Sequence, residues 1–93
     1  MEIELIDNTD KSRFEVEIED KMAIMDYKKK DNKLYILHTE VPKEFEGKGI
    51  ASAMVKKVLN LIKEKDMKLV SLCPFVSGYI KRHPEYKSLV ANA

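Results

Sequence analysis

Two glycines flank a lysine in the segment EFEGKGIASAMV, residues 44–55, directly before a run with helical spacing. The chain has only three glycines, so two at one helix start are informative. The first-turn amides of a helix lack intrahelical partners, and the helix dipole adds partial positive charge there. Glycine lets a backbone approach a ligand closely and adopt positive φ. Gly47, Lys48 and Gly49 can therefore cradle a phosphate or simply shape a tight turn.

Two familiar phosphate motifs do not fit this loop. A P-loop places Ser or Thr after Gly-Lys, whereas Ile50 and Ala51 follow Gly49 here. A dinucleotide-binding fingerprint needs a third glycine, and Ser52 stands at that position. The segment is therefore neither of these motifs.

Three further side chains have types suited to catalysis: Cys73, His38 and Glu40. Cys73 precedes Pro74 at the start of a short predicted helix, a position that lowers a thiol pKa, although free cysteines are often simply buried. His38 or Glu40 could act as a general base, while His38 could equally be a hydrogen-bonded core residue. Two histidines and one cysteine at these separations make no recognised zinc pattern, so no metal is expected.

The first forty residues predict an antiparallel meander. Period-two alternation of apolar and polar residues marks strands at 2–5, 13–19 and 22–27, with turns at 19–21 and 28–32. A fourth strand spans Leu34–Val41 and ends at Pro42, which cannot donate to a ladder.

The fourth strand carries apolar residues on both faces at its start. Regular alternation places Leu34, Ile36, His38 and Glu40 on one face and Tyr35, Leu37, Thr39 and Val41 on the other. We therefore expect a central strand covered on both sides, with polar groups at its carboxyl end.

The second half of the chain predicts a crossover. Helical spacing from Ile50 indicates an amphipathic helix of about four turns. A short apolar strand, Met67–Cys73, then follows, and the crossover places it parallel to the fourth strand. A short helix begins at Pro74 and ends at His83, and residues 85–90 form one more turn.

In this context the glycine loop resembles the pyrophosphate loop of the GNAT acetyltransferases, [Q/R]xxGxG/A, between the fourth strand and the main helix. HTEVPKEFEGKGIASAMV and SLCPFVSGYIKRHPEY are similar to the small GNAT-like family of predicted N-acetyltransferases, whose pattern is HTxVP, GxGIAxxLV, CPF and HPEY. The resemblance covers residues 38–86. Glu44 departs from it, because Gln or Arg is usual there, so binding is expected through backbone amides.

The resemblance implies a minimal α+β GNAT fold: an antiparallel sheet with strands four and five splayed, one main helix and short C-terminal helices. The helices that usually follow strand one are absent, because residues 8–12 are too few to form them. We treat residues 1–93 as one such domain.

The function implied is binding of acetyl-coenzyme A as co-substrate and transfer of its acetyl group to an amine of a small molecule, peptide or protein. The alternative is a non-catalytic acyl-coenzyme A binding or sensing module. The cofactor-binding residues implied are Val41, Gly47, Lys48, Gly49, Ile50, Ala51, Tyr79 and Arg82. The tyrosine acid of many GNAT enzymes falls on Ile80, which leaves Cys73 as acid or nucleophile; Tyr79 also suits a packing role.

Composition narrows the partners. Seventeen basic and 16 acidic residues give a net charge of +1, which argues against nucleic acid as partner despite the Lys28–Lys30 run. The single cysteine suits a reducing cytoplasm. No apolar run approaches the roughly 20 residues of a membrane span, so no membrane partner is expected.

Overall fold

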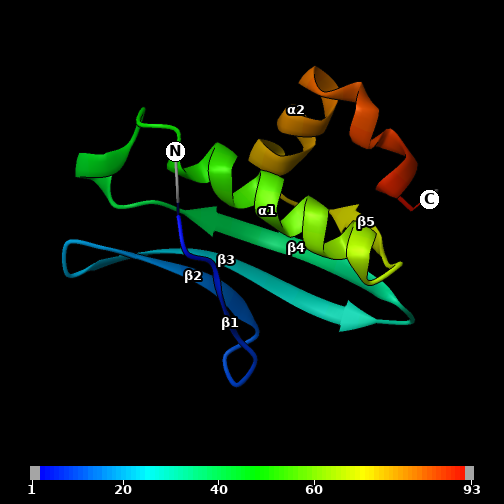
Figure 1. The fold of residues 1–93 in the computed structure, drawn as a ribbon, viewed down its shortest axis with the longest axis horizontal. Helices are drawn as coiled ribbons and strands as arrows, with labels where there is room; N and C mark the ends of the chain where they lie inside the picture. Colours follow the sequence, from blue (N-terminus) through cyan, green and yellow to red (C-terminus); the bar gives the residue numbers. More distant parts are fainter. Residues whose placement is uncertain (1–2, 92–93) are drawn as a thin grey trace.

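The computed structural model describes residues 3–91, and its framework is a five-stranded sheet in the order β1-β2-β3-β4-β5 (Figure 1). The pairs from β1 to β4 are antiparallel, whereas β4 and β5 are parallel, which confirms the predicted crossover. In chain order the elements are β1 (Ile6–Asn8), β2 (Arg13–Ile18), β3 (Lys21–Lys30), β4 (Lys33–Glu40), the 3₁₀ turn η1 (Lys43–Phe45), α1 (Ile50–Glu64), β5 (Lys68–Ser71), α2 (Pro74–Arg82) and the 3₁₀ segment η2 (Pro84–Leu89).

One hydrophobic core lies between the sheet and the helices. α1 crosses one face of the sheet, and α2 packs beside it (Figure 1). The apolar stripe of α1 is buried as its periodicity predicts, through Ile50, Met54, Val55, Val58, Leu59 and Ile62. α2 adds Val76, Tyr79 and Ile80 to the same cluster.

The hairpins β2–β3 and β3–β4 turn without glycine. Glu19 and Asp20 link β2 to β3, and Asp31 and Asn32 link β3 to β4; all four have positive φ, between 46° and 71°. Two-residue loops with both central residues at positive φ match the twist of the flanking strands. The predicted turn over 28–32 was therefore too long, because Lys28–Lys30 continue β3.

The predicted first strand at 2–5 was wrong. β1 comprises Ile6–Asn8, and Glu2 lies outside the described residues. Ile3 and Leu5 pack against the core without a strand partner, so their alternation reflects one-sided burial rather than ladder pairing. The polar turn that follows is too short for the extra helices of larger GNAT domains, as expected.

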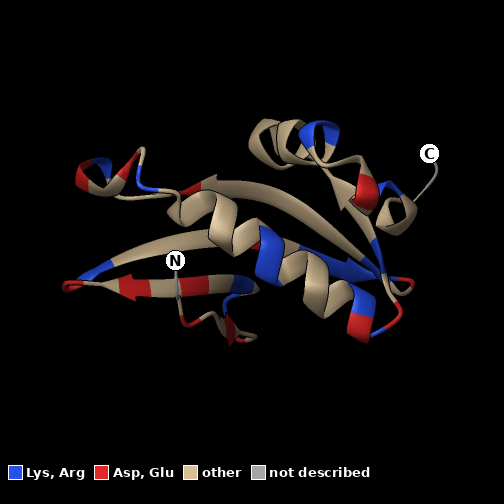
Figure 2. Cartoon of the chain, turned by 45° about the horizontal axis from the view of Figure 1, so that its top comes forward, with Lys and Arg blue, Asp and Glu red and all other residues tan. Residues whose placement is uncertain are grey.

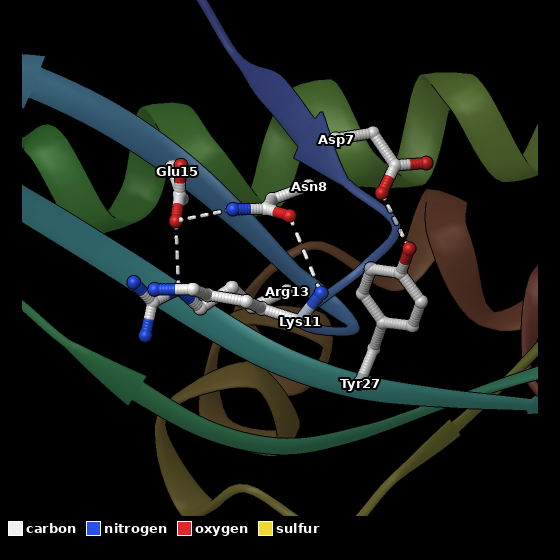
Figure 3. Close-up of polar contacts among 6 residues, drawn as sticks. All are labelled: Asp7, Asn8, Lys11, Arg13, Glu15 and Tyr27. Carbon is white, nitrogen blue, oxygen red and sulfur yellow. Dashed lines mark hydrogen bonds and ion pairs between the residues drawn. The ribbon is translucent and has the colours of Figure 1, made fainter.

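Side-chain contacts hold the short β1 strand in place (Figure 3). Asn8 Nδ2 and Arg13 Nε donate to the same Glu15 oxygen, at 3.1 and 2.7 Å. The Tyr27 hydroxyl donates to Asp7 on the core side. These bonds connect β1 to β2 and to β3, which compensates for a ladder of only three residues.

An extra residue in β4 changes the faces expected for its carboxyl half. Tyr27 pairs with Ile36 and Asp26 pairs with His38, so Leu37 has no partner on β3. This β-bulge places His38 on the face away from the core, and Thr39, paired with the fully buried Met25, on the core face. The prediction that His38 and Glu40 share a face with Leu34 and Ile36 was wrong for this reason.

β5 is shorter than predicted, and it leaves part of β4 unpaired. Pairing ends at Ile36 and Ser71, followed by one bond from the Leu72 amide to the Ile36 carbonyl at 2.9 Å. β4 continues to Glu40, whereas the chain after Leu72 turns into α2. The two parallel strands therefore splay apart beyond residue 36.

The second face of the sheet is uncovered among the described residues, contrary to the expectation of cover on both sides. Leu37 and Leu72 remain 42% and 59% exposed. We call this surface the open face. Arg13, Glu15 and Asp26 lie on it, together with the residues that pair with them on the neighbouring strands.

Candidate functional site

The glycine loop leaves the amino end of α1 without a side-chain cap. Gly49 is the N-cap residue, with φ of 84° and no side-chain capping bond, and Gly47 has φ of 79°. No acidic side chain lies in the first turn. The leading amides of α1, those of Ile50, Ala51 and Ser52, therefore have no intrahelical acceptor and suit an anion.

A pocket of about 370 Å³ lies against these amides. Its walls come from the end of β4, the glycine loop, the first turn of α1 and the start of α2. The lining residues are Thr39, Val41, Phe45, Glu46, Gly47, Gly49, Ile50, Ala51, Ser52 and Phe75. A Cβ placed on Gly47 or Gly49 would meet nothing within 4 Å, so the backbone itself forms this wall.

Cys73 lies at the splay between β4 and the chain leaving β5. It is 5% exposed, it is the N-cap of α2, and its Sγ is 3.5 Å from Thr39 Oγ1. Because Thr39 also lines the pocket, the thiol and the pocket share a wall. The predicted position of Cys73 at a helix start is confirmed.

Opposing influences set the pKa of the Cys73 thiol. Burial, the largest influence, raises it, but backbone amides of Val76, Phe75 and Thr39 and the Thr39 hydroxyl together bring the pKa below its ordinary value. These amides belong to the first turn of α2 and to the unpaired edge of β4. These donors favour the thiolate form of Cys73 relative to that of an ordinary buried cysteine.

His38 and Glu40 are near each other but not near the Cys73 side of the sheet. His38 Nε2 is 3.5 Å from Glu40 Oε2, and both side chains are well exposed on the open face. The three catalytic candidates therefore do not come together: His38 and Glu40 lie on the open face, and Cys73 lies on the core side of the splay.

The other predicted ligand residues are distributed unevenly. Val41, Gly47, Gly49, Ile50 and Ala51 line the pocket. Three do not. Lys48 lines a neighbouring groove, Arg82 is exposed on α2, and Tyr79 is buried in the core.

The HPEY segment has a packing role. The His83 ring stacks on Tyr79 with centroids 4.2 Å apart, and Tyr86 lies 6.2 Å from Tyr79. The His83 amide also donates to the Tyr79 and Ile80 carbonyls at 2.9 and 3.1 Å. This arrangement ends α2 and holds η2 against it.

Glu44, the residue that departs from the GNAT motif, has a partner elsewhere. Its carboxylate is 2.9 Å from Lys21 Nζ at the start of β3, and this bond lowers the Glu44 pKa. Both side chains are about half exposed, so the ion pair contributes little to stability. Glu44 does not line the pocket.

Thr39, Phe45 and Phe75 belong to the site but were not predicted as site residues. All three lie within motifs quoted from the sequence: Thr39 in HTEVP, Phe45 in EFEG and Phe75 in CPF. For Thr39 the missing information was the bulge, which depends on pairing between β3 and β4.

Within residues 3–91, no group of three His, Cys, Asp or Glu side chains lies close enough to hold a metal ion. No helix in this part of the chain is long and apolar enough to cross a membrane.

A mixed sheet with splayed parallel strands, a glycine loop at the main helix and a covering helix after β5 defines an acyl-coenzyme A N-acyltransferase architecture. The NMR solution structure of a GCN5-like N-acetyltransferase candidate from Staphylococcus aureus matches this fold with a TM-score of 0.75 at 22% identity, covering 97% of this chain and 89% of that one. The predicted α+β GNAT fold is confirmed.

The model of the GCN5-related N-acetyltransferase family matches residues 13–89, and the chain belongs to this family. Protein NATD1 from Xenopus tropicalis is 38% identical over 47 residues, which are 50% of this chain and 43% of that protein. Human NATD1 is also 38% identical over 47 residues, covering 50% and 42%. The matched part thus spans less than half the length of these relatives.

Proposed function

We propose that the protein binds acetyl-coenzyme A and transfers its acetyl group to an amine. One observation carries the proposal: the pocket joins the uncapped end of α1 to the unpaired edge of β4 and to the wall shared with Cys73. Backbone amides at one end suit a pyrophosphate, and a free strand edge suits an amide-containing arm.

The chain's own groups fit this ligand. The amides of Gly47–Ala51 would hold the pyrophosphate, and the edge of β4 up to Val41 would pair with the pantetheine arm. Lys48 and Arg82 stay candidates for contacts with the other phosphate groups. Acetyl-coenzyme A, when bound, supplies a thioester carbonyl that an amine can attack.

The acceptor would approach from the open face. Helices and core side chains fill the other side of the sheet, so the splayed end of β4 is the remaining approach. His38, beside Glu40, would take the proton of the incoming ammonium group. Cys73 would protonate the departing thiolate or accept the acetyl group first.

Backbone amide NMR during titration with acetyl-coenzyme A tests the binding. We expect the largest shifts at Gly47–Ala51. Pantetheine, which lacks the pyrophosphate, should leave these amides nearly unchanged and act as the control. Flat amides with acetyl-coenzyme A would refute the proposal.

Turnover is tested separately on a panel of amines. Wild type should acetylate at least one amine, and Cys73→Ala should lose most of that rate. Binding without turnover on every amine would favour the alternative, an acyl-coenzyme A sensing module.

We assign the activity to the cytoplasm, where the Cys73 thiol would stay reduced.

A further inference from the structure

The open face carries four lysines at the end of the sheet away from the splay. Lys30, Lys33 and Lys68 lie directly opposite one another across β3, β4 and β5, and Lys28 precedes Lys30 on the same face of β3. We call these four residues the lysine row. Figure 2 shows basic residues gathered at this end of β3, whereas acidic residues follow β2.

The lysine row is unfavourable in isolation. Like charges directly opposite on neighbouring strands repel. No carboxylate within residues 3–91 forms an ion pair with any of the four, and Lys68 Nζ instead donates to the Ser88 carbonyl at 2.7 Å. Lys29, on the core face, differs, because it approaches Asp7 and the Tyr27 ring. The charge of the row is therefore available to an anionic partner.

The same face is acidic toward its other end. Glu15, Glu17 and Asp26 lie there with one cation, Arg13, which pairs with Glu15, and Glu40 and His38 lie at the splay. A uniformly anionic polymer along the whole face would meet these carboxylates.

We propose that the lysine row docks an acidic segment of a polypeptide acceptor while the acceptor's amine reaches the splay. Lys33 and His38 are five residues apart on β4, about 17 Å in an extended strand. A partner segment running along β4 would thus carry its acidic residues roughly five positions from the amine. This inference names the acceptor class and rests on the proposed function.

Binding is tested without turnover. The probe is a blocked peptide with three glutamates, a spacer of about five Gly and Ser residues, and one lysine. We expect the peptide to shift most strongly the backbone amide signals of the protein around Lys28, Lys30, Lys33 and Lys68. These shifts should become smaller as the salt concentration rises. The control peptide replaces the glutamates with glutamines.

A charge reversal at the row gives the matched comparison. Lys30→Glu combined with Lys33→Glu should weaken glutamate-peptide binding about tenfold or more. The double variant should fold, because the new pair of like charges across β3 and β4 replaces a pair of like charges that is already there, and position 33 also lies opposite Lys68 on β5. Lys56→Glu with Lys57→Glu makes the same charge change on the exposed side of α1 and should leave binding unchanged.

Acetylation rates then separate this inference from the proposed function. For wild type, kcat/KM should be about tenfold higher for the glutamate peptide than for the glutamine peptide, and the row variant should lose this advantage. Nα-acetyl-lysine amide should be acetylated equally by both proteins. No acetylation of any amine refutes the proposed function, whereas equal rates for both peptides refute the docking site. Stronger binding of an oligonucleotide than of the glutamate peptide at the row would also overturn it.

Discussion

At the residue scale, the surroundings of Cys73 distinguish it from an ordinary buried cysteine. Its sulfur faces backbone amides of α2 and β4 together with the Thr39 hydroxyl, which lower its pKa despite burial. A thiol that served only packing would need none of these donors. The contact with Thr39 is the part of this arrangement that a substitution can remove.

The thiol environment predicts the pH dependence of Cys73 alkylation. Thr39→Val removes one donor to the thiolate, so the pKa should rise and the alkylation profile should move about 0.5–1 unit to higher pH. Thr39→Ser keeps the hydroxyl and should shift it far less. Iodoacetamide rates followed by mass spectrometry against pH measure both. An unchanged midpoint in Thr39→Val would contradict the role given to the hydroxyl.

At the element scale, the junction of β4 and α1 sets the geometry of the pocket. The bulge at Leu37 directs Thr39 and Val41 toward the helices, and the two glycines then bring the chain into α1. The bulge and the glycine turns are features of the backbone, so the side chains at these positions reveal little about how they shape the pocket. Gly49 has open space around it, which means that its conformation, not its size, requires glycine.

Glycine substitutions in the two helices should therefore have opposite effects on stability. Gly49→Ala forces a side chain onto positive φ and should cost about 1–2 kcal/mol of unfolding free energy. Gly78→Ala lies within α2 at ordinary φ, where its Cβ would meet a flexible Arg82 nitrogen at 3.4 Å. It should be neutral or gain up to about 1 kcal/mol. Urea denaturation measures both, and an unchanged stability of Gly49→Ala would show that the loop conformation does not require glycine.

At the scale of the whole molecule, the sheet depends on a few polar contacts at its β1 edge. Glu15 receives bonds from Arg13 and Asn8, which lower its pKa against the opposing effect of burial. A lowered pKa means that this stabilisation is complete above the ordinary value of 4.5 and is lost as pH falls through the folded-state pKa.

Acid unfolding tests this contribution. Glu15→Gln should make the unfolding free energy fall less steeply with decreasing pH between about pH 5 and 3 than in wild type. Glu17→Gln is the matched control, because Glu17 on the same strand makes no ion pair or side-chain hydrogen bond within residues 3–91. Identical slopes for Glu15→Gln and wild type would show that the bonds to Glu15 do not couple to folding.

The family, the main helix, the parallel crossover and the glycine loop could be predicted from the sequence, because each depends on local spacing or on motifs in order along the chain. The face of the sheet that each candidate residue occupies could not, because it depends on how the strands pair. One unpaired residue, Leu37, reverses the faces beyond it, and its position is set by hydrogen bonding between β3 and β4. That pairing brings Thr39 to Cys73, leaves His38 on the open face and aligns the lysine row across three strands.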